Sequence, residues 1–118
     1  MRLKSETIND LLVVKVLDSA VDAGNALELK ADLLPLVEKH RKVAIDMGKV
    51  KFMDSSGVGA MLSCLRAIHQ NSGELRLFSV KPNLYQLFKL VRLDTLVGIH
   101  ENRKTALEAF DRNSDANA

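Results

Sequence analysis

The 118-residue chain has one cysteine and no tryptophan, and it has no long apolar run. A single cysteine, Cys64, excludes an intramolecular disulfide bond and a zinc site built from several cysteines. No apolar stretch approaches the roughly 20 residues that a membrane-spanning helix needs. The start, MRLKSETINDLL, also lacks the apolar core and cleavage site of a signal peptide. We therefore expect a cytoplasmic protein that does not insert into a membrane.

The chain also lacks a strong excess of charge. Its 17 basic and 15 acidic residues nearly cancel, and the basic residues form no block. Because aromatic residues are scarce as well, little favours nucleic-acid binding. The length allows one domain with a real core but is too short for two ordinary domains. We expect that domain over residues 1–111 and a polar, disordered tail over residues 112–118.

Hydrophobic periodicity predicts the strands. Residues 2–8 and 11–17 read as a hairpin with its turn at Asn9-Asp10. Short β-branched or alternating runs then predict three more strands, at residues 43–47, 74–78 and 97–100.

Helices are predicted between these strands. Asn25 and Glu28 have the spacing of a capping box at the start of the first helix. Pro35 lies inside that helix and should kink or divide it, because proline removes a donor and clashes one turn back. Gly73 suits the left-handed position after the second helix. The other helices are expected over residues 58–70, from Pro82 to Val91, and from an Asn102 cap to Phe110.

The resulting order is β-β-α-β-α-β-α-β-α. After the hairpin, strands and helices alternate, which is typical of a mostly parallel sheet covered by helices. The sequence therefore predicts a single α/β domain with a sheet of about five strands.

The run Asp54-Ser55-Ser56-Gly57 opens the second long helix and is the most distinctive motif. A nucleophilic serine in a hydrolase elbow requires G-x-S-x-G, and the first glycine is missing. None of the three histidines lies in a catalytic signature, and no phosphate-binding loop of the type G-x-x-x-x-G-K-[ST] is present. The Asp and His residues show no metal-ligand spacing. We expect no enzyme activity, no metal and no cofactor.

Two interpretations of the motif remain open from the residues alone. One of its polar side chains can cap the following helix, which is worth about 1 kcal/mol. Small side chains on the same helix also predict a flat surface beside the serines where a partner could approach closely. Capping alone and capping with docking are equally compatible with this pattern. The small residues are Gly57, Gly59, Ala60, Ser63, Cys64 and Ala67.

The segment VAIDMGKVKFMDSSGVGAML resembles the signature of the anti-sigma factor antagonists of the STAS family (sulphate transporter and anti-sigma factor antagonist domain). In that family a buried strand is followed by Asp-Ser-Ser-Gly at the start of a helix. The resemblance extends over nearly the whole chain and implies a STAS-like fold. It implies that Ser55 is the phosphorylated serine, that Ser56 is its unmodified neighbour, and that Asp22 helps to contact a kinase. The loop Ser19-Ala20-Val21-Asp22 departs from the family pattern, which usually has Gly and a charged residue at its first two positions.

The resemblance implies a non-enzymatic switch in a bacterial partner-switching pathway. The unmodified protein would bind an anti-sigma factor that is also a serine kinase, and so free a sigma factor. Phosphorylation would end that binding, and a PP2C-type phosphatase would restore it. The partner-binding residues would be Asp22, Asp54, Ser55, Ser56, Gly57, Gly59, Ala60 and Ser63.

Two alternatives belong to other functional classes. The first is a STAS adaptor subunit of a transport or lipid-trafficking complex. The second is a small-ligand sensor, which a convergent polar cluster would favour and which the sequence does not display. The sequence leaves the oligomeric state open.

Overall fold

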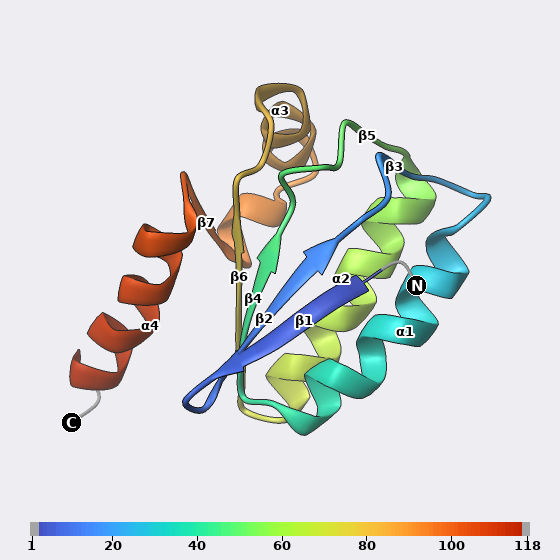
Figure 1. The fold of residues 1–118 in the computed structure, drawn as a ribbon. Coiled ribbons are helices and arrows are strands. Elements are labelled where there is room, and N and C mark those ends of the chain that lie inside the picture. The colour runs from blue at the N-terminus through green and yellow to red at the C-terminus, as the bar shows by residue number, and fades with distance from the viewer. Residues whose placement is uncertain (1–2, 117–118) are drawn as a thin grey trace.

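The computed structural model describes residues 3–116, which form a five-stranded sheet with helices on both faces (Figure 1). Strands β1 and β2 form the predicted antiparallel hairpin, and the remaining strands are parallel. The prediction of an α/β domain with a mostly parallel sheet is confirmed. In spatial order the strands are β1 (Leu3–Ile8), β2 (Leu11–Val16), β4 (Lys42–Asp46), β6 (Glu74–Phe78) and β7 (Gly98–His100).

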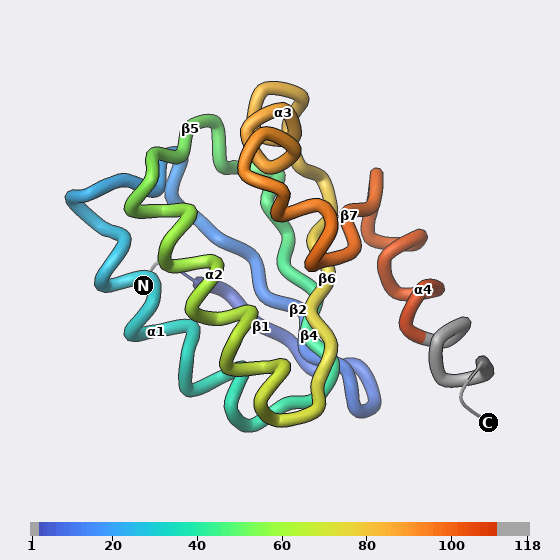
Figure 2. Tube along the Cα trace, turned by 180° about the vertical axis from the view of Figure 1, so that it is seen from behind, coloured from blue at the N-terminus to red at the C-terminus, as the bar shows by residue number. Residues whose placement is uncertain are grey.

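Three of the helices cover one face of the sheet and the fourth lies on the other. Helices α1 (Ala26–Lys39) and α2 (Ser55–Gln70) run side by side across the first face, as both views show (Figures 1 and 2). Helix α3 (Pro82–Leu90) and the short 3-10 helix η1 (Leu93–Thr95) contribute to the same core. Helix α4 (Arg103–Ala116) packs on the opposite face over β4, β6 and β7.

The apolar sequence of strand β2 explains why helices pack on both faces of the sheet. Its sequence LLVVKV is apolar at nearly every position, and successive side chains of a strand point to opposite faces. Leu12 and Val14 belong to the core under α1 and α2, whereas Leu11 and Val13 pack with Phe110 of α4. The sheet is therefore buried between two helical layers where α4 covers it.

The start and the middle of α1 differ from the sequence prediction. Asn25 occupies the N-cap position, but its side chain caps no helix N–H. Its Oδ1 accepts from the N–H of Asp22 and its Nδ2 donates to the carbonyl of Ala20, so it holds the preceding loop instead. Pro35 does not divide the helix, which is continuous from Ala26 to Lys39. Pro35 lies on the exposed side, where water can hydrate the carbonyl whose partner is missing.

The end of α2 has the predicted motif displaced by one residue. Ser72, not Gly73, has the left-handed conformation, with φ 58°. The N–H of Gly73 bonds to Ile68 O and that of Ser72 to His69 O, which is a Schellman motif. Gly73 is required for a different reason: a Cβ there would lie 2.6 Å from Ile68 Cγ1 and 2.7 Å from Arg41 O. The Asn102 cap, in contrast, is confirmed, because its Oδ1 accepts from Thr105 N at 3.0 Å.

Two short strands were not predicted. β3 (Ala20–Val21) and β5 (Phe52–Met53) pair in parallel as a separate small sheet. Two residues are too few to show a periodicity, so both segments read as loops. This pairing brings the loop before α1 beside the start of α2.

Helix α4 extends to Ala116 and so enters the segment that we predicted to be a disordered tail; residues 117–118 lie outside the described part of the chain. Over residues 3–116, no helix combines the length and the apolar character needed to cross a bilayer.

Candidate functional site

Asp54 is the N-cap of α2 and organises the motif identified in the sequence. Its Oδ1 accepts from the N–H of Ser56 at 2.8 Å and from that of Gly57 at 3.1 Å. These bonds satisfy two of the four donors left unpaired at a helix N-terminus. The capping role predicted for the motif therefore belongs to the aspartate, and neither serine side chain is needed for it.

The second oxygen of Asp54 reaches the loop before α1. Its Oδ2 accepts from the N–H of Ala23 at 3.2 Å, and the N–H of Asp54 donates to Val21 O at the same distance. In the β3–β5 pairing, Val21 is directly opposite Met53. The structure thus brings together Asp22 and Asp54, which are far apart in the sequence.

Asp22 shapes its own loop. Its Oδ1 accepts from the N–H of Gly24 at 2.9 Å, and its carbonyl accepts from the N–H groups of Asn25 and Ala26. The side chain is half-buried, so it is only partly available to a partner. Asp22 therefore fixes the entry into α1 beside the mouth of α2.

Ser55 and Ser56 are both exposed at the first turn of α2. Ser56 lines a groove of about 420 Å³ between the N-terminal halves of α1 and α2, whereas Ser55 lies outside that lining. We call this groove the α1–α2 groove. Its lining residues are Ala23, Ala26, Leu27, Lys30, Ser56, Gly59, Ala60 and Ser63.

The small residues of α2 do not all face the solvent as predicted. Gly59 does: a Cβ built there has no neighbour within 4 Å. Gly57 is buried, and a Cβ there would lie 2.5 Å from Met53 Cγ and 2.6 Å from Val21 O. Ala60 is buried at the floor of the groove, and Cys64 is completely buried in the core. The flat surface is therefore narrower than the sequence suggested, because part of the small-residue side packs against neighbouring elements.

Leu27 was missed by the sequence analysis. It lies in the first turn of α1 with 80% of its surface exposed and forms one wall of the α1–α2 groove. A single exposed leucine is ordinary, but this one stands beside the small residues and the serines. The only indication in the sequence was that Leu27 falls outside the series of apolar residues that the helical spacing buries.

The environment of Cys64 indicates a structural role. Burial raises the pKa of Cys64 to about 11, although the positive charge of Lys30 acts in the opposite direction. A thiol with a raised pKa is mostly protonated at neutral pH and is a poor nucleophile.

None of the three histidines lies at the mouth of α2. His69 lies in the last turn of α2, at the opposite end from Ser55. His40 follows the end of α1, and His100 lies on β7. Among the described residues, no three His, Cys, Asp or Glu side chains gather into a group that could hold a metal ion. The geometry is that of an exposed, capped helix mouth beside a shallow groove.

Comparison with known proteins gives the class of this domain. The family model of the STAS domain matches residues 2–106, so the chain belongs to the STAS domain family. The resemblance noted in the sequence is thereby confirmed.

Curated relatives and solved structures agree with this assignment. An anti-sigma-B factor antagonist of Staphylococcus epidermidis is 32% identical over 104 residues, which cover 86% of this chain and 95% of that protein. An anti-sigma-factor antagonist (STAS) domain protein from Planctomyces limnophilus has a TM-score of 0.83 at 18% identity, covering 91% and 96% of the two chains. The Bacillus cell fate determinant SpoIIAA, in its phosphorylated form, has a TM-score of 0.68 at 20% identity, covering 93% and 97%.

Proposed function

We propose that this protein is an anti-sigma factor antagonist whose partner binding is switched by phosphorylation of Ser55. The unmodified form binds an anti-sigma factor that is also a serine kinase and thereby frees a sigma factor. Phosphorylation ends the binding and a PP2C-type phosphatase restores it. The observation that carries the proposal is Ser55 itself, a hydroxyl that is exposed at the N-terminus of α2 and that the fold does not use as a cap.

The kinase would dock on the mouth of α2 and the adjoining α1–α2 groove. Asp54 ties the two loops together, Asp22 shapes one of them, and Gly57 lets α2 approach β3 closely. The partner would then contact the exposed serines and the small groove residues. In this proposal the contact set is Asp22, Asp54, Ser55, Ser56, Gly59, Ala60 and Ser63, with Gly57 as the support beneath it.

Charge provides the switch. A phosphate adds about −1.5 to −2 charges at pH 7. At a helix N-terminus the dipole stabilises an anion by roughly 0.3–1 kcal/mol, so the free protein tolerates the modification. Burying the same charge unpaired in an interface costs several kcal/mol, and every ~1.4 kcal/mol is a tenfold change in affinity. The interface penalty is the larger of the two, which releases the partner while the domain stays folded.

Two comparisons support the proposal. The Staphylococcus epidermidis relative is named an anti-sigma-B factor antagonist. The structural neighbour SpoIIAA exists in a phosphorylated form. Both facts belong to those proteins, and the proposal extends them to this chain.

The test uses the cognate kinase with ATP, followed by mapping of the modified residue by mass spectrometry. We expect phosphate on Ser55 and not on Ser56, because Ser55 directly follows Asp54. Calorimetric titration of the kinase then compares Ser55→Ala, Ser55→Asp and the matched variant Ser56→Asp. Ser55→Ala should bind and resist release, while Ser55→Asp should bind at least about tenfold more weakly than wild type.

Three results would contradict the proposal. Modification confined to Ser56 would show that the acceptor is misassigned. Equal affinities of wild type, Ser55→Ala and Ser55→Asp would remove the switch and favour an adaptor subunit of a transport or lipid-trafficking complex. An equally large effect of Ser56→Asp would show that the interface responds to any charge at the helix mouth.

A further inference from the structure

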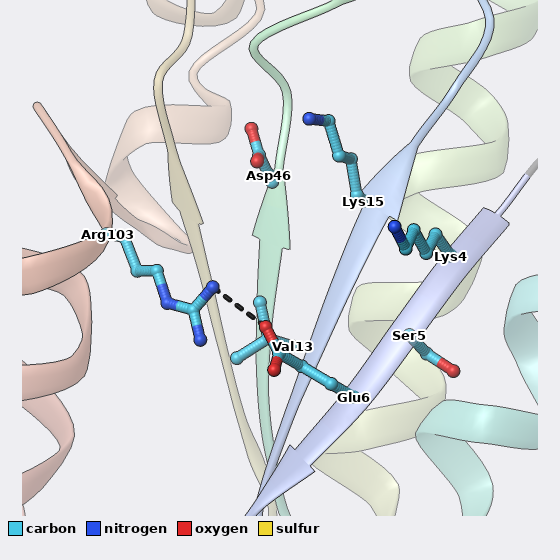
Figure 3. A pocket seen from close by; sticks show the side chains of 7 residues that line it. All are labelled: Lys4, Ser5, Glu6, Val13, Lys15, Asp46 and Arg103. Atoms are coloured by element: carbon cyan, nitrogen blue, oxygen red, sulfur yellow. Dashed lines mark ion pairs between the residues drawn. The ribbon is translucent and has the colours of Figure 1, made fainter.

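The face of the sheet opposite α1 and α2 carries a second hollow, away from Ser55. Helix α4 packs mainly over β4, β6 and β7, and the hollow lies beside it over part of β1 and β2. The hollow between α4 and these strands has a volume of about 350 Å³, within the range of small-molecule sites. Its lining is mostly charged, and Val13 contributes an apolar patch (Figure 3). The lining residues are Lys4, Ser5, Glu6, Val13, Lys15, Asp46 and Arg103.

Two lysines in this hollow stand directly opposite each other. Lys4 of β1 and Lys15 of β2 are partners in the antiparallel register, and Figure 3 shows both side chains on the same face of the sheet. Like charges directly opposite on neighbouring strands are destabilising. Across the part of the chain whose side chains are described, neither ammonium group has an ion pair or a side-chain hydrogen bond. A local arrangement that costs stability is typical of a functional site.

The acidic residues of the hollow form no direct ion pair with the two lysines. Glu6 pairs with Arg103 of α4, with Oε1 2.8 Å from Nη1. Asp46 of the neighbouring strand β4 lies directly opposite Lys15 in the parallel register. Its Oδ1 accepts from the N–H of Gly48 at 2.9 Å. Three cationic side chains thus share the hollow with two carboxylates, which leaves an excess of one positive charge, and among the described side chains Lys4 and Lys15 are the two cations of the hollow without a direct ion pair.

We propose that this hollow binds a small dianion, the phosphate or sulfate group of a soluble ligand, between Lys4 and Lys15. Two adjacent ammonium groups can donate to the same anion, and the lining carries one more cation than carboxylates. Arg103 and the N-terminal end of α4 border the same space and favour negative charge there. The recessed shape, with Val13 in the lining, suits a small ligand with an apolar part. This site is independent of the proposed switch, since it lies on the other face of the sheet.

The experiment is a titration of the ¹⁵N-labelled protein with sodium phosphate at pH 7 and constant ionic strength, with chloride replaced by phosphate. We expect saturable shifts at the backbone amides of Lys4, Val13, Lys15 and Arg103. The double variant Lys4→Gln/Lys15→Gln should bind at least about tenfold more weakly. The matched control Lys39→Gln/Lys89→Gln removes two exposed lysines from helices α1 and α3 and should bind like wild type. A parallel titration with sulfate identifies, by the tighter binding, which of the two groups the site prefers.

Thermal melting gives a second readout that a purely structural pair of lysines would not produce. Without phosphate, the Lys4→Gln/Lys15→Gln variant should melt close to wild type, because it loses both the like-charge contact with Lys4 and the attraction between Lys15 and Asp46. With phosphate, wild type should gain stability by mass action and the variant should not. Non-saturating shifts with both anions, or equal binding by wild type, double variant and control, would overturn the proposal.

Discussion

Asp54 and Ala23 are joined by a hydrogen bond of 3.2 Å between a carboxylate oxygen and a backbone N–H, across 31 residues of chain. The other oxygen of the same carboxylate caps α2. One side chain therefore fixes both the mouth of the helix that carries Ser55 and the loop that carries Asp22. A structural change in either the helix mouth or the loop should therefore alter the other one through Asp54.

This double role predicts graded effects of substitution at Asp54. Asp54→Ala removes the cap and the loop contact, and should lower the free energy of unfolding by about 1–2 kcal/mol. Asp54→Asn keeps an oxygen for the cap but places an NH₂ group toward the N–H of Ala23, so its loss should be smaller. Urea unfolding measures both. Equal midpoints for Asp54→Asn and wild type would mean that the bond to Ala23 contributes nothing to stability.

The two glycines at the start of α2 should respond in opposite directions. Gly57→Ala places a methyl group against the backbone oxygen of Val21, which cannot move aside, and should cost about 1–3 kcal/mol. Gly59→Ala enters open space and should stabilise the helix by up to about 1 kcal/mol. Thermal or urea unfolding of the pair decides this. Similar losses in both variants would show that helix geometry, and not local space, sets the requirement for glycine.

Leu27 should matter for partner binding and not for folding. Leu27→Ala should leave the unfolding midpoint nearly unchanged, because the side chain is 80% exposed. It should weaken binding of the kinase about tenfold if the α1–α2 groove is the docking site. Leu90 is the matched control, since it is a helical leucine with 81% exposure on α3, outside the groove lining. Equal affinities of Leu27→Ala and Leu90→Ala in a calorimetric titration would place the interface elsewhere.

Cys64 should be unreactive while the protein is folded. Because burial raises the pKa of Cys64 from its ordinary value near 9 to about 11, the folded state favours the neutral thiol. That contribution to stability is fully present below pH ~9 and is lost as the pH rises through ~11. Iodoacetamide near neutral pH should label Cys64 slowly in buffer and quickly in urea.

Cys64→Ala gives the matching functional test. It should leave partner affinity within about threefold of wild type, since the thiol lies in the core and lines no part of the groove. Rapid labelling of the folded protein, or loss of regulation in a folded Cys64→Ala variant, would indicate a redox role.

Local patterns in the sequence predicted most of the fold. The hairpin turn at Asn9, the alternating strand at residues 74–78 and the Asn102 cap each have a sequence pattern confined to a few residues, and the structure has all three. The errors also have local causes. Asn25 had the spacing of a capping box, but its amide found partners in the preceding loop, which spacing alone does not reveal. Pro35 was tolerated because it lies on the exposed side of α1.

The sequence by itself determined the α/β order and the position of Asp54-Ser55-Ser56-Gly57 at the start of a helix, since capping and periodicity act over one or two turns. Only the tertiary structure decided which side of that helix is free. The β3–β5 pairing places Asp22 beside Asp54, packing against Val21 buries Gly57, and α1 supplies Leu27 to the groove. It also placed α4 on the far face and left Lys4 opposite Lys15. Apart from the Lys4–Lys15 pair, whose register follows from the hairpin turn, these contacts join segments distant in the sequence, so they depend on which surfaces pack together and not on any local pattern.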